Sequence, residues 1–266
     1  MKLIAIDMDD TLLNNQNIVT PVQNDFLIHL IREKGIKIVI STGRLVDGIK
    51  NLLSPELYEL VYVIALNGSL ILNNDKTIIK SDQITNKLFK ELLTQFEDYK
   101  LDMSILDEFN YYRFSPQNND FMDHEEKLNK TTIRYLDIEE YKNTNILKSL
   151  LFYHPTERKK IEKKVLESTI PGLRPIFTQP YLVEFLPIDT NKGTALEYLS
   201  NYLDIDMKDT VAIGDGTNDI ELMERAGHAI AMGNAIEEVK NISDFVTLPN
   251  NKDGVKVGIE RLLRGD

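Results

Sequence analysis

The sequence predicts an α/β protein whose core is a doubly wound parallel sheet, interrupted by a smaller inserted α+β domain. Apolar runs at residues 3–6 and 211–213, near the two ends of the chain, lack polar alternation, as expected of parallel strands buried on both faces. Both runs end in carboxylates. Between them, from about residue 83 to residue 179, the chain becomes richer in Lys, Glu, Asn and Tyr. We therefore expect two halves of one core on either side of an insertion.

The first predicted strand, in KLIAIDMDDTLL (residues 2–13), ends at Asp7. Ligands bind at the carboxyl edge of such sheets, and Asp7 and Asp9 occupy alternate positions of an extended exit, so both can face one crevice. Two carboxylates there can hold a divalent cation, and one can attack an electrophile while the other, protonated, donates to a leaving group. An acidic turn is the simpler interpretation. A calcium loop is excluded because Leu12 and Ile18 stand where an EF-hand needs glycine and glutamate.

The next segment is predicted to complete a βαβ unit. Thr20 and Pro21 supply a cap and a first-turn proline for a helix to about Lys34, which Gly35 ends. A second apolar strand should follow within residues 36–44.

That second strand, in IKIVISTGR, ends in a hydroxyl, a glycine and an arginine. Thr42 and the amide of Gly43 can bind phosphate oxygens ahead of a helix at residues 45–53. The alternative is that Ser41 and Thr42 are ordinary capping residues.

The remaining elements before the second acidic cluster belong mostly to the insertion. Residues 62–66 are predicted to form a strand, and residues 71–79 a hairpin around Asn73-Asn74-Asp75. The insertion is predicted to hold helices at 86–99 and 156–168 and strands at 101–106, 111–114 and 146–153. Residues 117–130 are polar and fit a loop or a short helix.

A lysine precedes the helix predicted from NKGTALEYL. Lys192 stands before an amphipathic pattern, where it opposes the helix dipole unless an anion lies nearby, and this indicates a bound phosphate. A solvated surface lysine is the alternative.

The second acidic cluster, in TVAIGDGTND (residues 210–219), again follows an apolar run that is predicted to be a buried strand. Its glycines allow a tight turn, and Asp215 and Asp219 bracket the start of a helix at 219–225 with Asn218 or Thr217 as its cap. A favourable helix dipole would explain Asp219 by itself, but not Asp215 at the strand end. Two acidic strand ends indicate one oxygen-ligand site, of the kind that suits magnesium.

Composition narrows the class of protein. With 266 residues the chain can form two domains, and its net charge of -11 disfavours nucleic acid or an anionic membrane as partner. No apolar stretch has the length of a membrane span, and Met1-Lys2 leads directly into a strand without a signal peptide, so we expect a cytoplasmic protein. The absence of cysteine excludes thiolate chemistry, and the four histidines show no metal-ligand spacing.

Together these motifs resemble the haloacid dehalogenase superfamily of aspartate-nucleophile phosphatases. Asp7-Met8-Asp9-Asp10-Thr11-Leu12 is similar to the first motif, Thr42 to the second, Lys192 to the third and Gly214-Asp215-Gly216-Thr217-Asn218-Asp219 to the fourth. Asp10 replaces the glycine often found at its place. Asn67-Gly68, residues 181–192 and Asp253-Gly254-Val255 extend the resemblance to the Cof-type subfamily with a type IIB cap.

The resemblance implies a Rossmann-like catalytic core at residues 1–82 and 186–266, with the cap, which governs substrate specificity, at 83–185. It also implies that Asp7 is the nucleophile and that Asp9 is the general acid and base. The implied Mg²⁺ ligands are Asp7, the Asp9 carbonyl and Asp215, with Asp219 orienting the metal shell. The implied phosphate-binding groups are the Met8 amide, Thr42, Gly43, Lys192 and Asn218.

The expected function is therefore Mg²⁺-dependent hydrolysis of small phosphorylated metabolites, sugar phosphates foremost. A phosphosugar mutase would use the same intermediate, and a non-catalytic sensor of phosphorylated metabolites is a third possibility. The presence of both Asp7 and Asp9 disfavours the sensor, since binding needs no nucleophile and acid. The oligomeric state is not predicted.

Overall fold

The computed structural model describes residues 1–99, 101–115, 119–168 and 170–265. These residues form two compact units. The first unit comprises Met1–Arg44, Ile49–Lys80 and Asn191–Asp266, and the second comprises Leu45–Gly48 and Ser81–Thr190. Residues 83–185, the predicted cap, lie within the second unit, together with residues 81–82 and 186–190.

The first unit is built on an eight-stranded sheet with the order β14-β13-β12-β1-β2-β3-β4-β5. Pairing is parallel from β14 to β3 and antiparallel between β3 and β4, which confirms the predicted parallel core and adds an antiparallel edge. The strands are β1 (Leu3–Asp7), β2 (Lys37–Ser41), β3 (Tyr62–Ala65), β4 (Leu70–Leu72), β5 (Ile78–Ser81), β12 (Thr210–Gly214), β13 (His228–Ala231) and β14 (Phe245–Val246).

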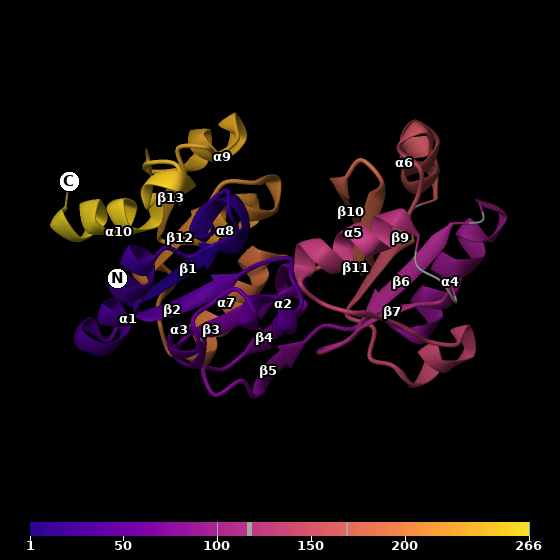
Figure 1. The fold of residues 1–266 in the computed structure, drawn as a ribbon, viewed down its shortest axis with the longest axis horizontal. Coiled ribbons are helices and arrows are strands. Elements are labelled where there is room, and N and C mark those ends of the chain that lie inside the picture. The colour runs from indigo at the N-terminus through magenta and orange to yellow at the C-terminus, as the bar shows by residue number, and fades with distance from the viewer. Residues whose placement is uncertain (100, 116–118, 169, 266) are drawn as a thin grey trace. The chain divides into compact units, whose positions relative to one another are not determined.

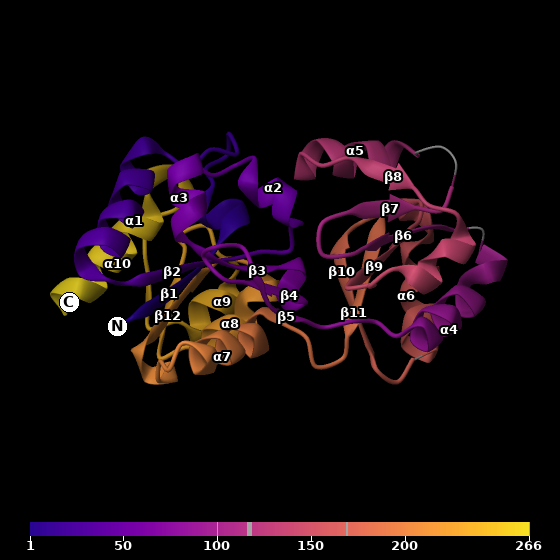
Figure 2. The same ribbon diagram turned by 90° about the horizontal axis from the view of Figure 1, so that it is seen from below.

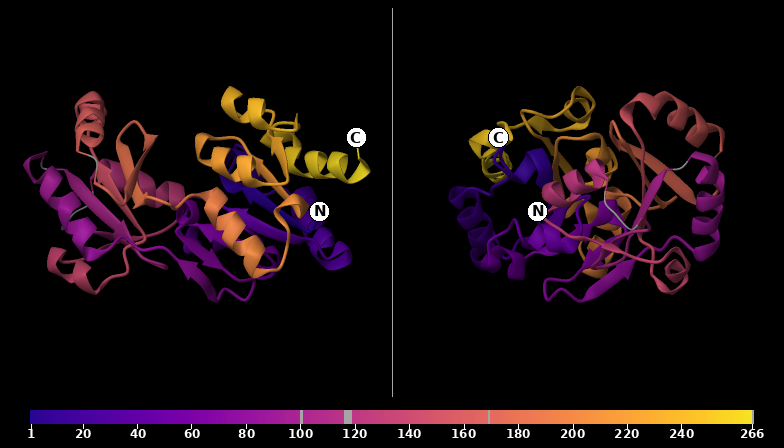
Figure 3. Two further views of the ribbon diagram at one scale, coloured as in Figure 1. Left: turned by 180° about the vertical axis from the view of Figure 1, so that it is seen from behind. Right: turned by 45° about the vertical axis from the view of Figure 1, so that its right-hand side comes forward.

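Helices cover both faces of this sheet. Figure 2 shows α1 and α3 on one side of the strands and α7 and α8 on the other. The helices are α1 (Pro21–Lys34), α2 (Val46–Lys50), α3 (Pro55–Leu60), α7 (Lys192–Tyr202), α8 (Ile220–Arg225), α9 (Glu237–Ile242) and α10 (Gly254–Arg264). Helix α10 packs against α1, and both ends of the chain lie at the same end of the first unit, as Figure 3 shows.

Local chemistry accounts for α1 and for the strands at the centre of the sheet. The Thr20 hydroxyl accepts a hydrogen bond from the Gln23 amide, Pro21 opens the helix, and Gly35 ends it in the left-handed conformation, as predicted. All five residues of β1 are buried, which explains its apolar run. The predicted hairpin is also present, since the Asn73 amide donates to the Thr77 carbonyl between β4 and β5.

The second unit is an α+β structure on a six-stranded sheet with the order β10-β11-β9-β6-β7-β8. Pairing is antiparallel except between β7 and β8. The strands are β6 (Asp102–Leu106), β7 (Tyr111–Arg113), β8 (Ile133–Tyr135), β9 (Lys148–Phe152), β10 (Leu173–Gln179) and β11 (Leu182–Pro187), and the helices are α4 (Asn86–Phe96), α5 (Asp120–Asn129) and α6 (Arg158–Glu167) (Figure 1). Apolar side chains of α4, α6 and the strands, among them Phe89, Ile161 and Leu151, form one hydrophobic core.

The structure shortens one predicted helix and decides between loop and helix for one polar segment. The helix expected at 45–53 is confined to Val46–Lys50. Within the polar segment predicted as a loop or short helix at 117–130, residues Asp120–Asn129 form α5, while residues 117 and 118 lie outside the described residues. Within the described part of the chain, every helix is too short or too polar to cross a lipid bilayer.

Candidate active site

The site lies where the central strands of the first unit end. Strand β1 pairs in parallel with β12 on one side and with β2 on the other, with Ile6 opposite Ile213 and Asp7 opposite Ser41. The carboxyl ends of the three strands therefore share one edge, which is the position where open α/β sheets bind ligands.

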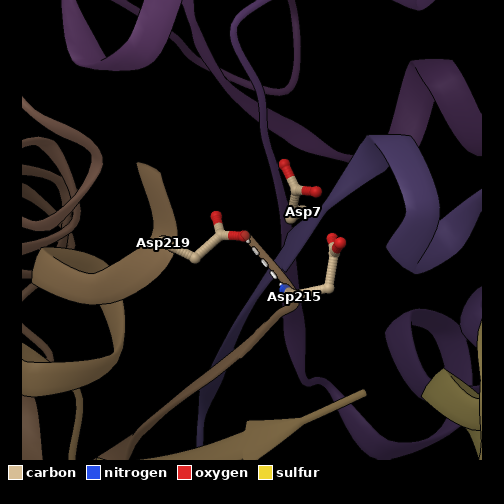
Figure 4. A group of neighbouring side chains, drawn as sticks. All are labelled: Asp7, Asp215 and Asp219. Atoms are coloured by element: carbon tan, nitrogen blue, oxygen red, sulfur yellow. Dashed lines mark hydrogen bonds between the residues drawn. The ribbon is translucent and has the colours of Figure 1, made fainter. Parts of the chain in front are cut away.

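Three carboxylates meet at this edge. Asp7 ends β1, Asp215 follows β12 and Asp219 lies one turn further on, and oxygen atoms of all three lie within 4.8 Å of one another (Figure 4). Asp7 and Asp219 are buried, whereas Asp215 is half-buried. Burial, together with the neighbouring carboxylates, raises the pKa of Asp7 well above its usual value. The pKa of Asp215 is raised to about 6, first by burial.

Asp219 is held from several sides. Its Oδ2 atom accepts hydrogen bonds from the amides of Asp215 and Gly216, both at 3.1 Å, and the first of these is drawn in Figure 4. A Cβ atom at Gly214 would lie 2.6 Å from the Asp219 carboxylate, so glycine is needed there. The prediction that Asn218 or Thr217 caps this helix is wrong. Both residues lie inside a 3₁₀ turn before α8, and the residue at the cap position of α8 is Asp219. The Asp219 carboxylate does not bond to the first amides of α8 but accepts from Asp215 and Gly216, which precede the turn.

Lys192 joins the cluster from another element. It is the first residue of α7, its side chain is fully buried, and its Nζ atom lies 2.5 Å from Asp7 Oδ1 and 2.7 Å from Asp219 Oδ1. Burial by itself would lower the pKa of Lys192, but the two carboxylates outweigh it and the pKa is raised. The interpretation of Lys192 as a solvated lysine is therefore wrong. The anions that compensate it in this structure are carboxylates.

This lysine reaches the carboxylates because α7 and α8 approach each other closely. A Cβ atom at Gly193 would lie 2.1 Å from the carbonyl oxygen of Glu221 in α8. The start of α7 is fixed by Asn191, whose side chain accepts from the Thr194 amide while the Thr194 hydroxyl accepts from the Asn191 amide.

The Asp9 carboxylate is not part of this cluster. Arg44, which is 4 % exposed, donates to it through Nε at 2.8 Å and through a terminal nitrogen at 2.7 Å. The two side chains thus form a bidentate pair between the loop after β1 and the end of β2.

The predicted phosphate-binding residues gather at the same edge of the sheet. Thr42 is buried one residue beyond β2, and its hydroxyl accepts from the Arg44 amide at 3.2 Å. The Asn218 side chain donates to Asn67 Oδ1 at 3.3 Å, and a Cβ atom at Gly43 would lie 3.0 Å from the same oxygen. Met8 is buried directly after Asp7.

Three further residues, to which the sequence assigned no role, contact the predicted site residues: Arg44, Asn67 and Thr11. The Thr11 hydroxyl donates to Asp215 Oδ1 at 2.8 Å and so orients a carboxylate 204 positions away. The available signals were the arginine that ends STGR and the Asn-Gly pair after β3, where Asn67 has a φ of +55°.

The donor set fits a divalent cation. Three carboxylates face one ammonium group, so fully ionised the cluster carries two excess negative charges. Burial first, and then repulsion between the carboxylates, raise the pKa values of Asp7 and Asp215. Carboxylate oxygens are the ligands that Mg²⁺ prefers. Both Asp219 oxygens already accept hydrogen bonds, so Asp7 and Asp215 are better placed to bind the ion directly.

Fold and site together define an α/β protein with a cluster of carboxylates and a lysine at the carboxyl edge of its parallel sheet. A model of the haloacid dehalogenase-like hydrolases matches residues 4–259, and the chain belongs to this family.

Individual relatives agree. The chain is 32 % identical over 288 residues to the 5-amino-6-(5-phospho-D-ribitylamino)uracil phosphatase YwtE of Bacillus subtilis, covering 100 % of this chain and 99 % of that protein. A haloacid dehalogenase-like hydrolase from Bacteroides thetaiotaomicron superimposes with a TM-score of 0.87 at 28 % identity, covering 98 % and 99 % of the two chains. The subclass IIB sugar phosphatase BT4131 shares the fold, with a TM-score of 0.82 at 24 % identity and coverage of 100 % and 99 %. The predicted family and enzyme class, a phosphatase, are confirmed.

Proposed function

We propose that this phosphatase hydrolyses phosphomonoesters of small metabolites, sugar phosphates foremost, with Mg²⁺ and through an aspartyl-phosphate intermediate. The observation that carries the proposal is the buried Asp7 carboxylate, 2.5 Å from Lys192 and grouped with Asp215 and Asp219. Asp7 would be the nucleophile, Lys192 would supply a permanent positive charge beside it, and Asp7 and Asp215 would bind the metal ion.

Asp7, Asp215 and the Asp9 backbone carbonyl would hold the ion, with Asp219 keeping Asp215 and Lys192 in place. When bound, Mg²⁺ supplies positive charge that offsets the repulsion between the Asp7 carboxylate and an anionic phosphate. Lys192 supplies a second, permanent positive charge beside Asp7.

In the first step, an Asp7 oxygen forms a bond to phosphorus as the bond from phosphorus to the substrate's alcohol oxygen breaks, and Asp9 gives that oxygen its proton. In the second step, Asp9 takes a proton from water, the water oxygen bonds to phosphorus, and the bond to Asp7 breaks. The Met8 amide, Thr42, Gly43, Lys192 and Asn218 would bind the remaining phosphate oxygens. The Asp9 carboxyl group must first give up its hydrogen bonds from Arg44, so that it can face the leaving group and donate a proton to it.

Residues 83–185, which lie within the second unit, would act as the cap that selects substrates, as the resemblance implies. The name of BT4131 supports sugar phosphates, and that of YwtE supports a phosphorylated ribityl compound; both are phosphate esters of polyhydroxylated chains. We further propose a cytoplasmic location, where such phosphorylated metabolites are found, and no nucleic-acid or membrane partner, in keeping with the net charge of -11.

The test is inorganic phosphate release from a panel of phosphorylated sugars, nucleotides and cofactors, with Mg²⁺ and with chelator. We expect release that requires Mg²⁺ and is fastest with sugar phosphates. Transfer of phosphate to a second sugar without net release would establish a mutase instead. Binding without either reaction would establish a sensor.

A further inference from the structure

The loop after β1 carries Asp9, yet its conformation is held by residues far away in the chain. This loop, residues 8–13, turns through Asp10, which has a φ of +54°, a left-handed conformation that residues other than glycine rarely adopt. Asp10 stands between Asp9 and Thr11, and these two side chains contact Arg44 and Asp215. The conformation of Asp10 therefore sets where both of them point.

Three side-chain amides from three segments hold the carbonyl oxygens of this loop. Asn234 Nδ2 donates to the Asp10 carbonyl at 2.7 Å, Gln23 Nε2 to the Leu12 carbonyl at 3.2 Å, and Asn250 Nδ2 to the Leu13 carbonyl at 3.0 Å. Gln23 and Asn250 are buried. Two of the three bonds join segments more than 220 positions apart, so the C-terminal part of the chain clamps the loop that follows β1.

The three side chains that hold the loop, Asn234, Gln23 and Asn250, are called the clamp here, and two of them are bonded to each other. The backbone amide of Asn250 donates to Asn234 Oδ1 at 2.9 Å, so Asn250 orients the Asn234 side chain. Asn250 Nδ2 also contacts Asn15 Oδ1, and the Thr20 hydroxyl donates to Asp253 Oδ1 at 2.6 Å. The segment Asp253-Gly254-Val255, which carries part of the resemblance, thus contacts the residue that caps α1.

We infer that Asn234 is a positioning residue, supported by Asn250 and Gln23, which fixes the plane of the Asp10–Thr11 peptide and so the placement of Asp9 and Thr11. The bond to the Asp10 carbonyl stabilises the left-handed conformation that the loop needs. Without it, Asp10 can relax toward negative φ, which rotates Asp9 away from the site and weakens the Thr11 bond to Asp215. The inference rests on the proposed function for the role of Asp9, but not for the Thr11 contact.

The test compares Asn234→Ala with Asn241→Ala, which removes an exposed asparagine of α9 outside the clamp. For Asn234→Ala we expect kcat to fall and the Mg²⁺ dissociation constant, measured by calorimetry without substrate, to rise, each by about 10-fold or more. KM should change by less than about twofold and the unfolding temperature should stay near that of wild type, because Asn234 is exposed. Gln23→Met, which keeps size but removes the amide, should give a smaller effect since its bond lies further from Asp9.

The inference is overturned if Asn234→Ala matches Asn241→Ala in both kcat and Mg²⁺ affinity. It is also overturned if the variant only lowers the unfolding temperature while kcat and Mg²⁺ affinity per folded molecule are unchanged. If wild type releases no phosphate from any compound, the proposed function fails, and the calorimetric comparison still decides the inference.

Discussion

Replacing Lys192 by methionine removes the one ammonium group that the structure shows among the three carboxylates, while keeping the length of the side chain. Both contacts of Nζ, with Asp7 and with Asp219, are buried, and the side chains of Lys192 and Asp219 are fully shielded from solvent. Removing one partner of a buried ion pair costs about 3–5 kcal/mol, and the loss of two contacts places this variant near the upper end. For a chain of 266 residues that corresponds to a drop in unfolding temperature of roughly 10 °C or more.

The cost of Lys192→Met should depend on pH and on metal. Without the ammonium group the already raised pKa values of Asp7 and Asp215 rise further, so the folded state takes up protons that the unfolded state does not bind near neutrality. Stability then increases as the pH falls. The deficit relative to wild type should be larger at pH 8 than at pH 5, and Mg²⁺ should reduce it at pH 8.

Differential scanning calorimetry at both pH values, with Mg²⁺ and with chelator, measures these differences. Lys148→Met is the matched control, because Lys148 forms a buried pair with Glu184 at 2.6 Å in the second unit. It should lose stability without any recovery on adding Mg²⁺. An equal deficit for Lys192→Met at pH 5 and pH 8, with no response to Mg²⁺, would refute the electrostatic account of the cluster.

Three further predictions concern single groups of the site. Because burial raises the pKa of Asp215 to about 6, Mg²⁺ affinity measured by calorimetry should fall roughly tenfold per pH unit below that value, and a flat profile from pH 7 to pH 5 would contradict this. Thr11→Val removes the hydroxyl that holds the pKa of Asp215 down, so the fall in Mg²⁺ affinity should begin at a higher pH, by up to about one unit; an unshifted profile would count against the bond. Asp9→Asn should lower kcat by about 10²–10⁴-fold while Mg²⁺ still binds, and a kcat near that of wild type would exclude Asp9 as the acid and base.

The sequence predicted the features that depend on local chemistry. The apolar runs before Asp7 and Asp215 are buried strands, and capping residues define α1 from Thr20 to Gly35. Since parallel strands end at one edge, the meeting of the two acidic segments followed from these assignments.

Contacts between distant segments were not accessible in the same way. The pairing of Asp9 with Arg44 depends on β1 and β2 lying side by side in the sheet. The burial of Lys192 depends on how α7 and α8 pack, and the bond from Asn234 to the loop after β1 depends on where the C-terminal part of the chain lies. The predicted cap at Asn218 or Thr217 was wrong because Asp219, read as a first-turn acid, turns its carboxylate back onto the Asp215 and Gly216 amides. Strand β10 was missed since most of its residues are half-buried, which leaves no alternation to read.

The central claim is that the Asp7 carboxylate attacks phosphorus, and phosphate release by Asp7→Asn tests it most directly. The amide keeps the size of the side chain but is a far weaker nucleophile, and it removes a negative charge from the cluster. We expect that Asp7→Asn unfolds at or above the temperature of wild type and releases no phosphate from any substrate that wild type hydrolyses with Mg²⁺. Release at the wild-type rate by a folded Asp7→Asn protein would contradict it.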